Sequence, residues 1–106
     1  MDTTRELISK QAAEFKAKCR ITEVISAVHK ERQFQDAKWG SIVERPHSLP
    51  EWILIAEAEL NEAKWAVIKG GSGRNSVRAE IIQVMAVLQA ALEQHGIVDN
   101  NDERSL

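Results

Sequence analysis

Apolar residues recur at intervals of three and four through most of this 106-residue chain. Since an α-helix turns once every ~3.6 residues, this spacing places them along one helical face. No segment alternates apolar and polar residues in the way that predicts a half-buried strand. We therefore predict an all-α fold, an antiparallel helical bundle formed by one domain over residues 1–95. The polar tail over 96–106 is expected to be disordered.

Cap and turn residues divide the pattern into helical regions. The first runs from about Thr4 to Asp36 and ends at Trp39-Gly40, with glycine where helix C-termini favour it. Thr22 is a potential N-cap, so the sequence leaves open whether this region is one helix or two. The second region begins at Ser48-Leu49-Pro50-Glu51, which has the pattern of a capping box with proline in the first turn, and runs to about Lys69.

Residues 70–73 form a glycine-rich turn, after which Asn75 or Ser76 caps a third region that runs to about Gln94. A chain of this length buries only about two thirds of the surface that its unfolded form exposes. Long helices with apolar stripes and no sheet to cover them gain from self-association. We therefore expect oligomerisation to complete the bundle, as a homodimer or homotetramer.

The charge balance and the cysteine content narrow the classes of function. Fourteen Lys and Arg residues against sixteen Asp and Glu give a formal charge of −2, which disfavours a nucleic-acid polymer as partner. Cys19 is the one cysteine, so it is interpreted as a small apolar filler in a protein of the reducing cytoplasm. No apolar run approaches the ~20 residues of a membrane span, and the first residues show no signal-peptide core.

Acidic residues occur where the helical pattern predicts burial. On a helical wheel Glu59 falls among apolar residues, and Glu62 lies about 60° to the other side of it. Glu80 falls inside the apolar arc of the third region, and Gln83 lies one turn further on. The apolar neighbours on the two wheels are Trp52, Ile55, Ala56, Ala63 and Ala66, and Val77, Val84, Val87 and Ala91.

Matched polar pairs inside two apolar stripes need a physical explanation. Burying a carboxylate without compensation costs several kcal/mol, and three that converge also repel one another. A divalent cation resolves both problems, and oxygen ligands suit Mg²⁺ or Mn²⁺ rather than zinc. Glu59, Glu62, Glu80 and Gln83 are thus candidate metal ligands. The more ordinary alternative is that these acids pair with Lys or Arg of another helix.

These residues resemble the MazG-like all-α nucleoside triphosphate pyrophosphohydrolases, which carry an ExxE pair on one helix and an ExxD pair on the next. Glu59-Leu-Asn-Glu62 is similar to the first pair. Glu80-Ile-Ile-Gln83 is similar to the second, with glutamine in place of the aspartate. The segment from Glu31 to Gly40 contains Gln-Asp-Ala-Lys-Trp-Gly and resembles the small phage and mobile-element members of the group.

The resemblance implies a metal-dependent hydrolase that cleaves a nucleoside triphosphate between its α- and β-phosphates and releases pyrophosphate and a nucleoside monophosphate. Glu59, Glu62 and Glu80 would be the catalytic residues and would hold Mg²⁺, or alternatively Mn²⁺. Gln83 would assist directly or through water. The same resemblance does not indicate which glutamate accepts the proton of the attacking water.

Four further residues are candidates for binding the substrate. Lys38 and Arg74 are favoured for contact with phosphates, and Trp39 for stacking on a base. Gln35 has the hydrogen-bonding groups to reach a base edge. The ordinary interpretation is a solvated helix face for the polar residues and core packing for Trp39.

The remaining tryptophans, Trp52 and Trp65, are predicted to lie in the core or in an interface. A non-enzymatic alternative is a helical oligomerisation or protein-interaction module. It explains the apolar stripes equally well, but it gives no reason for acids at matched positions within them.

Overall fold

The computed structural model describes residues 3–99. This part of the chain contains α1 (Thr4–Trp39), α2 (Leu49–Lys69), the short 3₁₀ helix η1 (Gly73–Asn75) and α3 (Val77–His95). It contains no strand, so the predicted all-α class is confirmed. In the same residues no helix is long and apolar enough to cross a membrane. The tail expected to be disordered falls mostly on residues 100–106, outside the described range.

Side-chain caps fix where the helices begin. The Ser48 hydroxyl accepts a hydrogen bond from the Glu51 backbone N–H, and the Glu51 carboxylate accepts one from the backbone N–H of Ser48, so the predicted capping box is confirmed. The Ser76 hydroxyl accepts from the Ala79 N–H at 3.2 Å and caps α3. Ser76, and not Asn75, is therefore the N-cap of the third helix.

The first region is one continuous helix that extends beyond Asp36 to Trp39. Thr22 does not cap a second helix, because its hydroxyl donates back to the Lys18 carbonyl at 3.3 Å. Such a bond to the preceding turn is compatible with an unbroken helix. Gly40 ends α1 with φ at 96°, a backbone conformation that favours glycine.

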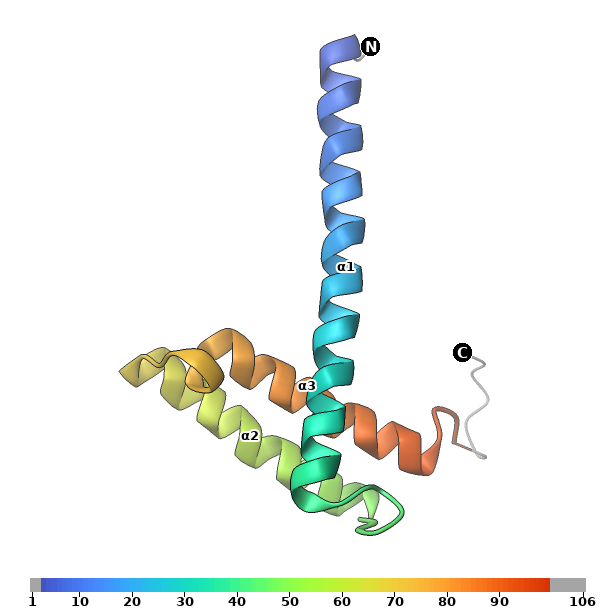
Figure 1. The fold of residues 1–106 in the computed structure, drawn as a ribbon, viewed down its shortest axis with the longest axis vertical. Helices are drawn as coiled ribbons and strands as arrows, with labels where there is room; N and C mark the ends of the chain where they lie inside the picture. Colours follow the sequence, from blue (N-terminus) through green and yellow to red (C-terminus); the bar gives the residue numbers. More distant parts are fainter. Residues whose placement is uncertain (1–2, 100–106) are drawn as a thin grey trace.

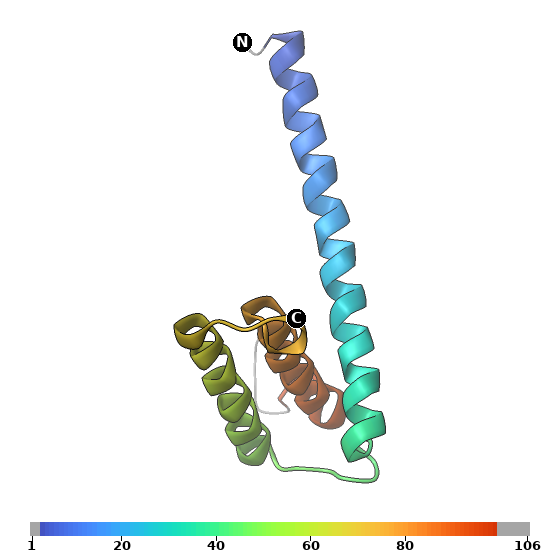
Figure 2. The same ribbon diagram turned by 60° about the vertical axis from the view of Figure 1, so that its left-hand side comes forward.

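The three helices form a pair and a crossing helix. α2 and α3 run antiparallel, side by side, and α1 crosses and packs against α3 (Figures 1 and 2). The antiparallel arrangement therefore describes the α2–α3 pair within one chain. The N-terminal half of α1 extends away from the other helices in both views.

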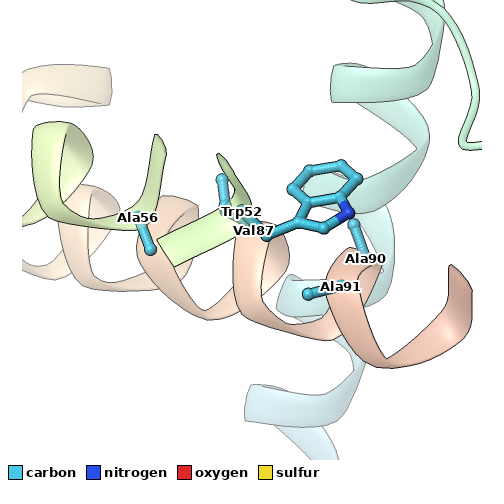
Figure 3. Close-up of a cluster of buried hydrophobic side chains, with 5 residues drawn as sticks. All are labelled: Trp52, Ala56, Val87, Ala90 and Ala91. Atoms are coloured by element: carbon cyan, nitrogen blue, oxygen red, sulfur yellow. The ribbon is translucent and has the colours of Figure 1, made fainter. Parts of the chain in front are cut away.

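The core lies between α2 and α3 and is built largely from alanine. Trp52 and Ala56 of α2 pack with Val87, Ala90 and Ala91 of α3 (Figure 3). Small side chains let the two helix backbones approach closely, and the Trp52 ring fills the space at one end of the pair. The predicted core position of Trp52 is confirmed.

The apolar stripe of α1 is largely exposed in the single chain, because this half of the helix lies beyond α3. Residues 3–26 are all exposed. The interpretation of Cys19 as a buried filler was wrong, since its side chain is exposed on this segment. The large apolar side chains exposed there are Leu7, Ile8, Phe15, Ile21, Val24 and Ile25.

Candidate functional site

Three glutamates from two helices meet at one point. Glu59 and Glu62 stand one turn apart on α2, and Glu80 faces them from the first turn of α3. One carboxylate oxygen from each lies within 4.8 Å of the others. We call these three residues the triad. The structure thus brings together the three acidic residues that the sequence singles out as metal ligands.

Burial differs across the triad and leaves two oxygens without partners. Glu80 is only 4% exposed, Glu59 is partly buried, and Glu62 is exposed. Oε2 of Glu59 and Oε2 of Glu80 are buried and accept no hydrogen bond from any residue of the described chain. An unsatisfied buried polar group costs about 1–3 kcal/mol, and more when it is charged. The oxygen donors and the two orphaned atoms fit a hard divalent cation.

Burial and mutual repulsion shift the acidity of the triad. Burial raises the pKa of Glu59 to about 7, and the charges of Glu62 and Glu80 contribute to the same effect. Burial also raises the pKa of Glu80, with a further contribution from Glu62, whereas the Arg74 charge opposes the increase. Perturbed carboxylates gathered in one place are typical of functional sites.

Glu31 of α1 brings a fourth carboxylate close to the triad, and sequence reasoning missed it. It is 8% exposed, and its charge adds to the raised pKa values of Glu59 and Glu80. Its two oxygens accept from Nη1 and Nη2 of Arg74 at 3.2 Å each, and Gln35 Nε2 donates to Oε2 at the same distance. The signal that marks this face is the helical spacing of Val28, Glu31, Arg32 and Gln35, the buried residues of α1.

Gln83, the fourth predicted metal ligand, uses its amide nitrogen in the turn before α3. Its Nε2 donates to the backbone carbonyl of Arg74 at 2.9 Å. The backbone carbonyl of Gln83 accepts from Gln35 Nε2 at 3.3 Å. The side chain of Gln83 therefore connects α3 to the turn that carries Arg74.

A cavity of about 250 Å³ opens beside the triad, between α1, the loop after it and the α2–α3 pair. Glu59 lines it together with Gln35 and Trp39, two of the predicted substrate-binding residues. Trp52 and Arg45 also belong to its wall. Trp39 is 49% exposed, so it lies at the edge of the cavity and not in the core.

The two predicted phosphate-binding cations lie outside the wall of this cavity. The Lys38 ammonium lies 4.7 Å from the centre of the Trp39 ring and 5.9 Å from that of Phe34. The Arg74 guanidinium lies 4.0 Å from the Phe34 ring centre and pairs with Glu31. Arg74 is thus held near the triad, whereas Lys38 contacts the Trp39 ring.

A second hollow of about 310 Å³ lies on the other side of the triad. Glu62, Glu80, Trp65 and Lys69 are among its lining residues. Trp65 is 55% exposed, so it does not belong to the core of this chain, and the Lys69 ammonium lies 4.7 Å from its ring centre. Sequence reasoning did not connect Trp65 with the site. Its position three residues after Glu62 was the available signal.

A different charged cluster borders the cavity and is fully paired. Arg32 is 5% exposed, and its guanidinium donates to Glu93 at 2.8 and 3.1 Å and to Asp36 at 2.8 Å. We call Arg32, Asp36 and Glu93 the arginine cluster. Each nitrogen of the buried guanidinium thus has a carboxylate oxygen as its acceptor.

Comparison of the chain with protein-family models, with curated proteins and with solved structures gave no match. The likeness to MazG-like hydrolases stays a prediction from the sequence, and the site is interpreted from its own geometry.

Proposed function

We propose that this chain is a metal-dependent nucleoside triphosphate pyrophosphohydrolase of the MazG-like type, which releases pyrophosphate and a nucleoside monophosphate. One observation carries the proposal: Oε2 of Glu59 and Oε2 of Glu80 are buried without partners inside a cluster of three carboxylates. A structural role would have given these oxygens a donor, as the arginine cluster gives its own. A cation supplies the missing partner.

Glu59, Glu62 and Glu80 are the residues that would hold the metal. Hard carboxylate oxygens favour Mg²⁺, with Mn²⁺ as a substitute. When bound, such an ion neutralises phosphate charge and lowers the pKa of a coordinated water. A triad oxygen left free accepts the proton of the attacking water, and Glu59 is suited to this role because it also lines the cavity.

The cavity suggests how the nucleotide lies. It extends from Glu59 to Trp39, so phosphates held at the triad leave the sugar and base to occupy it. In this pose Trp39 stacks on the base and Gln35 lies at its edge. Arg74 is the predicted cation that lies near the triad and its phosphates, whereas Lys38 lies against Trp39, at the end of the cavity where the base would be. Trp65 offers a stacking surface on the opposite side of the triad.

We further propose that copies of the chain associate as a homodimer or homotetramer. The exposed apolar residues of α1, together with Ile53, Leu54, Leu60 and Ile68 of α2, support this assembly. The same surface favours the second candidate function, a helical interaction module without catalytic activity. Light scattering at micromolar concentration tests the assembly, and a folded monomer would contradict it.

The experiment that tests the activity is a screen for pyrophosphate release from canonical and modified nucleoside triphosphates, with Mg²⁺ and with Mn²⁺. We expect turnover of at least one nucleotide and a loss of about a hundredfold or more in Glu80→Gln. Glu57→Gln is the matched control, because Glu57 lies on the exposed face of the same pair of helices. If no nucleotide is turned over and no metal binds, the enzymatic proposal is contradicted and the interaction module is the remaining candidate function.

A further inference from the structure

Gln83 makes a hydrogen bond that a carboxylate at this position could not make. Its partner is the backbone carbonyl of Arg74, at 2.9 Å. A carbonyl oxygen only accepts, so the side chain must present an N–H group there. An aspartate or glutamate carboxylate at position 83 has no hydrogen to donate. The turn therefore accounts for a glutamine at this position without invoking a metal.

The turn that Gln83 holds is tight and exposed. A Cβ atom on Gly71 would lie 2.1 Å from the Asn75 carbonyl oxygen, which shows how closely the chain folds back on itself. Backbone bonds close it, from the Asn75 N–H to Ser72 and from the Ser76 N–H to Gly73. The η1 turn has no buried residue of its own. Its position on the protein therefore depends on a few polar contacts.

Arg74 is the one charged side chain of this turn, and it is poised near the triad. Its guanidinium makes a two-pronged ion pair with buried Glu31 and stacks on Phe34, yet the side chain is 53% exposed. Its charge acts on Glu80 in the triad. A guanidinium in this setting can exchange one oxyanion for another, because the planar fork that binds a carboxylate also binds phosphate.

We infer that Gln83 is a positioning residue, which anchors the 71–75 turn so that Arg74 binds a phosphate group of a polyphosphate held at the triad. Glu31 holds the guanidinium in place until that phosphate arrives. The inference rests on the proposed function for the identity of the anion. It assigns Gln83 no metal-ligand role.

The test uses substitutions that separate the two roles of position 83. Gln83→Glu keeps the length and the oxygen but removes the N–H donor, and Gln83→Leu removes both. Arg74→Ala removes the guanidinium and keeps the backbone carbonyl that Gln83 contacts. Gln89→Leu is the control, since Gln89 lies on α3 and donates to Glu93 at an exposed site.

The first measurement is hydrogen exchange at the backbone amides of Asn75 and Ser76, which needs no ligand. We expect exchange to increase about tenfold in both Gln83 variants and to stay within about twofold of the wild type in Gln89→Leu. Unchanged exchange in Gln83→Leu and Gln83→Glu would overturn the anchoring role.

The second measurement is calorimetric titration with Mn²⁺ alone, and then with inorganic pyrophosphate in the presence of Mn²⁺. Positioning predicts Mn²⁺ affinity within about threefold of the wild type in Gln83→Leu, and pyrophosphate affinity reduced about tenfold, as in Arg74→Ala. Because both substitutions act through the same guanidinium, the double variant Arg74→Ala with Gln83→Leu should lose no more pyrophosphate affinity than either single variant. Weaker Mn²⁺ binding in Gln83→Leu, with tighter binding in Gln83→Glu, would identify a metal ligand and overturn the inference. A wild-type chain that binds no Mn²⁺ refutes the proposed function and the anion role together, whereas exchange still decides the anchoring.

Discussion

The triad and the arginine cluster are two groups of charged residues with opposite electrostatic character. In the arginine cluster the hydrogen bonds from Arg32 hold the pKa of Glu93 below its usual value, and Glu93 in turn raises the pKa of Arg32. In the triad burial raises the pKa values of Glu59 and Glu80. Glutamates of the same chain are thus stabilised as anions in one place and destabilised as anions in the other.

This difference indicates that the arginine cluster has a structural role, whereas the triad is a site for a cation that the chain itself does not supply. In the arginine cluster both carboxylates have a cationic partner within the chain, and the cluster joins α1 to α3 through Arg32 and Glu93. Within residues 3–99 no lysine or arginine forms an ion pair with the triad, and Arg74 pairs with Glu31 instead. Buried unpaired anions persist in proteins chiefly where function requires them. The four predictions below test this contrast, from the largest expected effect on stability to the smallest.

Replacing Arg32 with leucine should destabilise the fold by about 2–3 kcal/mol, because Glu93 and Asp36 lose their cation and α1 loses its link to α3. The estimate is below that for a fully buried pair, since both carboxylates are partly exposed. Urea unfolding followed by circular dichroism measures the change. Arg5→Leu, on the exposed part of α1, serves as control. Equal stability of the two variants would contradict the structural role of the cluster.

Replacing Glu80 with glutamine should stabilise the fold, whereas the Arg32 substitution destabilises it. Without metal at pH 8 we expect a gain of about 1–2 kcal/mol, because the substitution removes a buried anion from beside Glu62 and Glu59. The wild type should gain stability on addition of Mg²⁺, about 2.7 kcal/mol at a hundred times the dissociation constant, and the variant should not. Thermal unfolding with and without Mg²⁺ measures both. A destabilised variant and a wild type indifferent to Mg²⁺ would favour a structural triad.

The raised pKa of Glu59 predicts a pH dependence. The folded chain retains a proton on Glu59 up to about pH 7, whereas the unfolded chain releases it near 4.5. The metal-free wild type therefore loses stability from this group as pH rises between these values. Glu59→Gln does not titrate at this position, so it does not lose this stability. Its free energy of unfolding should therefore exceed that of the wild type by near zero at pH 4 and by about 1–2 kcal/mol at pH 8, a value reduced for solvent screening. A constant difference across this range would contradict the pKa shift.

Substitutions of the half-exposed tryptophans should affect stability least, by under about 1 kcal/mol each. If the base lies in the cavity beside Glu59, Trp39→Ala raises KM about tenfold with kcat within about threefold of the wild type, and Trp65→Ala changes neither. Steady-state kinetics on the nucleotide identified in the screen measures the effect. The reverse pattern would place the base in the hollow beside Glu62.

The sequence predicted those features that depend on interactions between residues close together in the chain. Local signals were sufficient for the helix ends at Ser48, Gly40 and Gly70, since caps act within a few residues. The wheel positions of Glu59 and Glu80 also sufficed to predict that the triad converges, because the glycine turn between their helices makes them antiparallel neighbours.

The features of the site that the sequence did not predict depend on contacts between residues far apart in sequence. The pairing of Arg74 with Glu31 spans 43 positions and that of Arg32 with Glu93 spans 61, and no local pattern encodes either. The burial of Glu31 was missed because a mostly polar face on α1 resembles a solvated one. Cys19 was misplaced because an apolar stripe predicts a covered face without saying whether the same chain covers it.

The central claim is that the triad, and not the arginine cluster, is a metal site. Its most direct test is calorimetric titration of Mn²⁺ and Mg²⁺ into the wild type, Glu80→Gln and Glu93→Gln at pH 8. The account predicts saturable binding in the wild type, loss of at least about tenfold in affinity for Glu80→Gln, and affinity within about twofold of the wild type for Glu93→Gln. Absence of binding in the wild type, or binding that survives Glu80→Gln unchanged, would contradict it.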